Sequence, residues 1–232
     1  GLSGILFYRY VVAFSQTRER LPKSIPLFFY GSNTYQDLVG ATPHFFYQEE
    51  EVIATALNRA VAAGHRSIGW VGTSVAKVHQ NRSAVFREWM AVHRQPLTES
   101  RILITDLHGD VFGSGGRPSL RSSLLSMAKE VSEICCSDDV TAASVVNFLT
   151  REGIQVPGAV SIIGIDDLLL CRYTAIPLST VKIPIYQDVQ TFFPKFIEQI
   201  ERPGTSSIPV DWRSPVSFIE RESFAPPSIS KT

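Results

Sequence analysis

The sequence predicts an α/β protein that contains parallel sheets. Short runs of branched and aromatic residues alternate along the chain with longer stretches whose apolar residues recur every three or four positions. Such alternation is typical of βα units, in which each helix returns the chain so that the next strand runs parallel to the last. The chain has 232 residues, 44% of them hydrophobic, which is enough for one α/β domain or two smaller ones.

The first half of the chain is expected to contain strands and two helices. The strands are short, nearly uninterrupted apolar runs, at residues 4–7, 25–30, 43–47 and 66–73. The helices show amphipathic spacing, at residues 50–63 and 82–93. Gly64 follows the first helix as its C-terminal stop, because glycine readily adopts the left-handed conformation that ends many helices.

The second half continues the alternation. Strands are expected at residues 102–106, 133–137, 160–165 and 216–222, with a crossover at 180–183. Helices are expected at 118–129, at 186–200, and from Asp138 to a stop at Gly153. Pro194 is expected to kink or split the last helix, because proline donates no backbone hydrogen bond.

The composition excludes several classes of protein. Lys and Arg number 22, as do Asp and Glu, whereas a domain that clamps DNA needs a basic face. We therefore expect this chain not to hold DNA by itself. Three cysteines do not make a disulfide framework, and no leader or long apolar run is seen, so a cytoplasmic location without membrane association is expected.

Pairs of carboxylates follow two of the expected buried strands. Asp138 and Asp139 follow residues 133–137, and Asp166 and Asp167 follow residues 160–165. Ligands of open parallel sheets bind beyond the carboxyl ends of the strands, so these pairs lie where a small polar molecule would bind. Each pair also has a simpler interpretation: an aspartate that caps a helix N-terminus, or a loop aspartate in a turn.

The chain resembles the effector-binding region of the LacI/GalR family of bacterial transcription regulators from about Gly4 to Pro227, most strongly in its second half, on six short motifs that occur in order. They are Gly64-His65 with Ile68, Arg82 to Phe86, Asp138 to Ala142, Val156 to Asp167, Pro177 to Val181, and Arg221 to Pro227. Val85 departs from the second motif, where the family has glycine, and Asp138 departs from the third, where it has asparagine.

The resemblance implies a type I periplasmic-binding-protein-like fold: two parallel-sheet α/β subdomains joined by crossover strands, with the ligand in the cleft. Residues 1–64 with 185–214 would form an N-terminal subdomain, which is incomplete because the family has about two more βα units before the position of Gly4. Residues 65–184 with 215–227 would form the C-terminal effector-binding subdomain, followed by a tail at 228–232.

The resemblance also implies partners. It predicts a homodimer and a small-molecule effector. Operator DNA would be bound only through a helix-turn-helix domain, which in the family precedes this region and is missing from the sequence.

Three residues are expected to bind the effector through polar groups. Arg82 offers a planar guanidinium that suits vicinal hydroxyls or a carboxylate, although a solvated helix-surface arginine is the simpler interpretation. Asp138 accepts hydrogen bonds where the family's asparagine both donates and accepts, which favours a ligand rich in donors. Asp166 stands at the end of the most apolar strand and would accept hydroxyl hydrogens.

Phe46, Tyr47 and Tyr173 are candidates for stacking on a sugar ring, with core packing as an equal alternative for each. The five histidines show no metal-binding spacing, and neither a metal nor a cofactor is expected.

Three functions follow. The first is the ligand-sensing and dimerisation core of a LacI-type DNA-binding regulator, which binds a sugar or polyol and catalyses nothing. The alternative is a solute-binding protein of a sugar transport system, which shares the fold. An enzyme that holds a metal on the paired carboxylates is the third and the least favoured.

Overall fold

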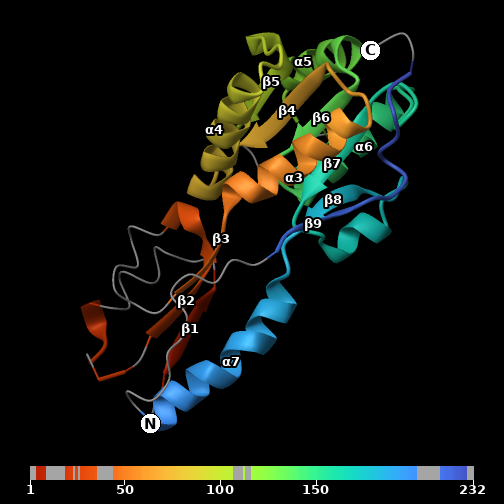
Figure 1. Ribbon diagram of the computed structural model, residues 1–232. Coiled ribbons are helices and arrows are strands. Elements are labelled where there is room, and N and C mark those ends of the chain that lie inside the picture. The colour runs from red at the N-terminus through yellow and green to blue at the C-terminus, as the bar shows by residue number, and fades with distance from the viewer. Residues whose placement is uncertain are drawn as a thin grey trace. The chain divides into compact units, whose positions relative to one another are not determined.

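The computed structural model describes residues 4–8, 19–22, 24–25, 27–35, 44–106, 112, 116–202 and 215–228. The chain divides into two compact units (Figure 1). Unit 1 comprises Gly1–Glu49 and Pro184–Pro215, and unit 2 comprises Glu50–Ile183 and Val216–Thr232. Each unit is therefore built from two stretches that are far apart in the sequence.

Unit 1 contains a parallel sheet in the order β1-β2-β3. Its strands are β1 (Ile5–Tyr8), β2 (Leu27–Ser32) and β3 (His44–Tyr47). Every residue of the central strand β2 is buried, as its run of apolar and aromatic residues predicts. Its alternating side chains face two sides, because Phe29 packs on Phe46 and Phe28 packs on Phe196 of helix α7 (Ile185–Glu201).

Helix α7 continues through Pro194 and is not split there, contrary to one of the two outcomes expected from the sequence. Packing explains why a proline is tolerated. Phe192 and Phe196, on either side of Pro194, are almost fully buried, and Tyr30 of β2 donates a 2.8 Å hydrogen bond to Asp188 in the first turn. These contacts with the sheet offset the one backbone hydrogen bond that proline removes.

Unit 2 contains a sheet in the order β5-β4-β6-β7-β8-β9. The first five strands in this order run parallel, and β9 pairs antiparallel with β8. The strands are β4 (Ile68–Thr73), β5 (Ile102–Thr105), β6 (Glu133–Cys136), β7 (Ser161–Ile165), β8 (Ser179–Lys182) and β9 (Ser217–Ile219). The expected crossover at 180–183 is thus a strand of this sheet. After it, the chain passes into unit 1 at Pro184.

The helices of unit 2 pack on both faces of its sheet. They are α3 (Glu49–Ala62, with Glu49 assigned to unit 1), α4 (Lys77–Val92), α5 (Pro118–Glu130) and α6 (Asp139–Arg151), with short 3-10 turns at Glu99–Arg101 and Leu169–Arg172. Cys136 of β6 packs with residues of α5 and α6 in one core cluster. Trp70 of β4 stacks on Phe86 of α4, with 4.9 Å between the ring centroids. The predicted α/β fold with parallel sheets is confirmed.

One helix boundary was predicted wrongly. Helix α4 begins at Lys77, five residues before the expected start at residue 82. The first five residues, Lys-Val-His-Gln-Asn, carry almost no apolar periodicity, so the sequence pattern gave no sign of them. The difference matters because it adds His79 to the same helix face as Arg82.

Candidate functional site

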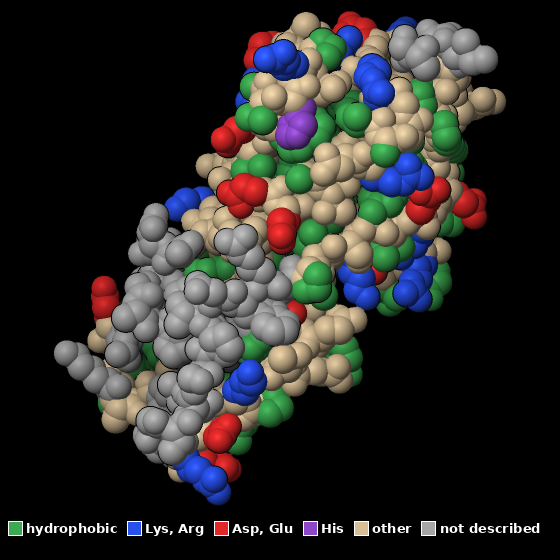
Figure 2. Space-filling model, in the orientation of Figure 1, with side chains coloured by type: hydrophobic (Ala, Val, Ile, Leu, Met, Phe, Trp, Pro, Cys, Tyr) green, Lys and Arg blue, Asp and Glu red, His purple; other side chains and the backbone are tan. Residues whose placement is uncertain are grey.

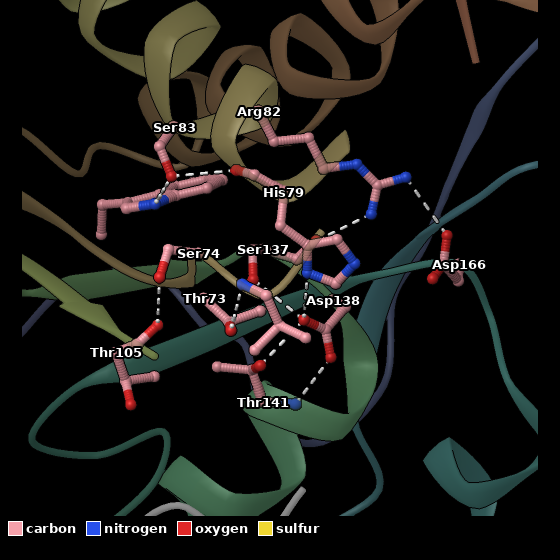
Figure 3. A network of polar contacts seen from close by, with 12 residues as sticks. Thr73, Ser74, His79, Arg82, Ser83, Thr105, Ser137, Asp138, Thr141 and Asp166 are labelled. Carbon is pink, nitrogen blue, oxygen red and sulfur yellow. Dashed lines mark hydrogen bonds and ion pairs between the residues drawn. The ribbon is translucent and has the colours of Figure 1, made fainter. Parts of the chain in front are cut away.

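Polar side chains gather where the parallel strands of unit 2 end (Figure 3). Thr73 ends β4 and Thr105 ends β5, while Asp138 follows β6 and Asp166 follows β7. Because these four strands run in one direction, their carboxyl ends meet at one edge of the sheet. We call this group, together with the residues of α4 that contact it, the polar edge.

Arg82 connects two parts of the polar edge. Its side chain is almost completely buried, and its Nη1 donates a 2.7 Å hydrogen bond to the carbonyl oxygen of Ser137. Its Nη2 lies 3.3 Å from Oδ1 of Asp166, a distance that makes the ion pair a long one. Arg82 is therefore not a solvated surface residue. It joins the end of β6 to the end of β7.

Asp138 is the N-cap of α6. One carboxylate oxygen accepts from the backbone N–H of Thr141 at 2.8 Å, and the other accepts from the Thr141 and Ser137 hydroxyls. His79 Nδ1 lies 3.2 Å from the second oxygen. Burial opposes ionisation of this carboxyl, but the hydrogen bonds from His79 and Thr141 outweigh it and hold the Asp138 pKa below its usual range.

His79 belongs to the polar edge but was missed by the sequence analysis. It lies one helical turn before Arg82, a spacing that places two side chains on the same face of a helix. That spacing would have been sufficient to find it, had the start of α4 been recognised. Its contact with Asp138 brings an imidazole, a carboxylate and the Arg82 guanidinium to one edge of the sheet (Figure 3).

Asp166 lies in a turn with unusual backbone geometry. Its φ is +117°, and that of the next residue, Asp167, is +54°. Asp167 pairs with Arg221 at 2.6 Å. Asp139, which was not a candidate ligand residue, is fully buried behind this turn and accepts hydrogen bonds from the Leu168 N–H and the Thr180 hydroxyl. Burial is the main cause that raises the Asp139 pKa to about 7.

The aromatic candidates lie in different surroundings. Phe46 is buried and packs on Phe29 at 5.9 Å in a core cluster of unit 1, while Tyr47 is buried beside Tyr30. These contacts agree with the core-packing alternative. Tyr173 in unit 2 is 78% exposed and is free of such packing. Ligand contact by any of these rings stays a prediction.

The polar edge offers several hydrogen-bonding groups. It presents carboxylates, hydroxyls, an imidazole and a guanidinium, which together can bind hydroxyl or carboxylate groups of a ligand. Within the described ranges, no group of three or more His, Cys, Asp or Glu is placed to hold a metal ion. Within the same ranges, no helix has both the length and the apolar character needed to cross a membrane.

Charge on the visible face of unit 2 is mixed. Figure 2 shows its Lys and Arg side chains interspersed with Asp and Glu, without a large patch of one sign. This agrees with equal numbers of acidic and basic residues in the sequence. The described part of this face therefore lacks the basic stripe that binds nucleic acid.

The chain matches a known family over most of its length. The model of the periplasmic binding protein-like domain family matches residues 57–224. The ribose operon repressor of Haemophilus influenzae is 29% identical over 155 residues, covering 64% of this chain and 44% of that protein. The HTH-type transcriptional regulator GalR of Escherichia coli is 32% identical over 133 residues, covering 56% and 37%.

A solved structure has the same fold. The sugar-binding transcriptional regulator of the LacI family from Escherichia coli, complexed with phosphate, superposes with a TM-score of 0.77 at 23% identity, covering 97% of this chain and 78% of that one. The family model, the curated relatives and the shared fold together confirm the resemblance inferred from the six motifs. The chain spans less than half the length of the two curated relatives.

Proposed function

Because the chain belongs to the family of periplasmic binding protein-like domains, we propose that it is the effector-sensing core of a LacI-type transcriptional regulator. The effector class proposed is a sugar or polyol. The names of the relatives support this, since one is a ribose operon repressor and another a sugar-binding regulator. The proposed activity is binding, and no turnover is part of it.

The observation that carries the proposal is the polar edge of unit 2. Arg82 of α4 and Asp166 at the end of β7 meet where ligands of parallel sheets bind. Buried charge that is already paired is fixed in position, so a ligand meets groups that need little reorganisation. A polyol can donate hydroxyl hydrogens to Asp166 and accept from Arg82.

We propose that unit 1 makes up most of the incomplete N-terminal subdomain expected from the resemblance. Unit 2 would be the C-terminal, effector-binding subdomain. The resemblance further suggests a homodimer, with operator DNA bound by a helix-turn-helix domain outside this chain. Effector binding would then act on DNA by shifting the population between two conformations of the regulator.

The direct test is a thermal-shift screen with D-ribose, D-galactose and other sugars and polyols. A ligand at about one hundred times its dissociation constant adds about 2.7 kcal/mol, which raises the melting temperature by several degrees. The Asp166→Asn variant should lose the shift. Asp106→Asn is the matched control, because Asp106 pairs with Arg117 on the surface of the same unit. If both variants keep the full shift, Asp166 does not bind the ligand.

A second measurement separates the regulator from the solute-binding alternative. Sedimentation of the purified chain should reveal a dimer for a regulator core, whereas a monomer that binds sugar tightly would favour the transport role. The curated relatives named above are transcriptional regulators, which favours the first outcome.

A further inference from the structure

The turn that carries Asp166 needs to be held in place. Two successive residues other than glycine, Asp166 and Asp167, have positive φ values of +117° and +54°. Each such residue costs on the order of 1–3 kcal/mol, and such backbone persists only where the surroundings enforce it. The position of the Asp166 carboxylate therefore depends on whatever restrains this turn.

Asp139 provides one restraint from the start of α6. Its Oδ2 accepts a 2.7 Å hydrogen bond from the N–H of Leu168, directly after the turn. Its Oδ1 accepts a 2.6 Å hydrogen bond from the hydroxyl of Thr180 in β8. Gly164 of β7 leaves the space that this carboxylate occupies, because a Cβ at that position would collide with Asp139 Oδ1.

The other restraints come from β8 and from the C-terminal segment. The N–H of Asp166 donates to the carbonyl oxygen of Val181 at 2.8 Å, which continues the pairing with β8. Asp167 accepts a hydrogen bond from Arg221, whose other terminal nitrogen donates to the carbonyl oxygen of Leu178. Asp139 differs from these because its hydrogen bond ties Leu168, the residue directly after the turn, to the start of α6.

We propose that Asp139 is a positioning residue: it touches no ligand but holds the turn that presents Asp166 to Arg82 and to the effector. The proposal rests on the proposed function, since it assigns Asp139 a part in the same binding site. The restraint itself exists in the protein alone, so it can be measured without any ligand.

The pH dependence of this restraint follows from the surroundings of Asp139. Burial first, and then the charge of Asp166, raise the Asp139 pKa to about 7, against the hydrogen bonds from Thr180, the Leu168 N–H and the Cys171 thiol. Cys136 of β6 also faces this charge. When the turn opens, Asp139 becomes solvated and its pKa returns toward 3.8. Opening should therefore become easier as the pH rises from about 4 to 7, by up to tenfold per unit, and should level off above 7.

Hydrogen exchange of the ligand-free protein tests the proposal. Asp139→Ala should speed the exchange of the Leu168 amide about 10- to 100-fold, since it leaves the Leu168 N–H without its hydrogen-bond acceptor. The variant should also lose the pH dependence of protection in peptides spanning residues 164–172. Asp106→Asn, which removes an exposed carboxylate, should change neither.

A pair of variants at Thr180 guards against general loss of folding. Thr180→Ser keeps the hydroxyl that donates to Asp139 and should retain protection, whereas Thr180→Val should lose it. Unchanged exchange of Leu168 in both Asp139→Ala and Thr180→Val would overturn the proposal. The proposal would also be overturned if these variants sped up exchange equally throughout unit 2, with no larger increase at residues 164–172.

Titration with D-ribose separates this proposal from the proposed function. If ribose binds, Asp139→Ala should weaken its affinity at least tenfold. If ribose fails to bind the unaltered protein, the sugar class proposed above loses support, and the exchange experiment still decides whether Asp139 positions the turn.

Discussion

Glu133 in β6 gives the sharpest test of the energetics of unit 2. Its side chain is fully buried, and neither carboxylate oxygen has a hydrogen-bond partner among the described residues. Burial raises the Glu133 pKa well above the ordinary 4.5. A charged carboxylate in such surroundings is costly, so burial favours the protonated form in the folded protein.

The size of the effect follows from proton linkage. Above pH 4.5 the unfolded chain releases the Glu133 proton while the folded protein keeps it. Stability therefore falls as the pH rises through this window, by about 1.4 kcal/mol per pH unit, until the folded pKa is reached. The glutamine of Glu133→Gln has nearly the same shape as glutamate but cannot ionise, so the stability of this variant does not fall with pH in this way.

Urea unfolding at pH 5, 6 and 7 measures the difference, with Trp70 and Trp89 of unit 2 as fluorescent reporters. We expect the free energy of unfolding of Glu133→Gln, relative to the unaltered protein, to grow by about 1.4 kcal/mol per pH unit. Glu99→Gln is the control. Hydrogen bonding to Arg87 lowers the pKa of exposed Glu99, so its difference should stay flat over this range. A flat difference for Glu133→Gln as well would refute the reasoning.

Three further substitutions test other contacts. Asp138→Ala removes the N-cap of α6 and should lower the free energy of unfolding in urea by about 1–2 kcal/mol at pH 7. This loss should shrink as the pH falls below 3.8, because the Asp138 pKa is lowered in the folded protein and only the ionised carboxylate is stabilised there. Gly164→Ala places a methyl group against Asp139 and should cost about 1–3 kcal/mol; an unchanged melting temperature would argue against this packing. Glu220→Gln breaks an exposed ion pair with Arg59 and should change the free energy of unfolding by less than about 1 kcal/mol. A larger loss would show that this ion pair stabilises the fold more than exposed ion pairs usually do.

Local patterns were sufficient to predict most of the fold. Helix α6 was predicted from Asp138 to Gly153 because an N-cap residue, a run of apolar residues and a glycine stop are adjacent in sequence. The start of α4 at Lys77 was missed because its first turn is polar. Apolar periodicity reveals only the buried face of a helix, so a helix end made of polar residues is not predicted by it.

The candidate site was predicted only where position along a strand was informative. Asp138 and Asp166 were selected because they follow buried strands. Asp139 was considered only as a member of the carboxylate pair, and its hydrogen bond to Thr180, 41 residues away, leaves no sign in the sequence. Glu133 was counted as part of a strand, but its burial depends on the helices that pack over the sheet, which no local pattern reveals.

The two-segment composition of unit 1 has a consequence for synthesis. The strands β1 to β3 leave the ribosome early, but α7, whose Phe196 packs on Phe28 and whose Asp188 binds Tyr30, follows only after β4 to β8 have been made. Tyr30 and Asp188 are 158 residues apart. At about 5–20 residues per second, the early sheet waits on the order of ten seconds for this helix. During that interval Phe28 and Tyr30 lack the helix that contacts them in the folded unit.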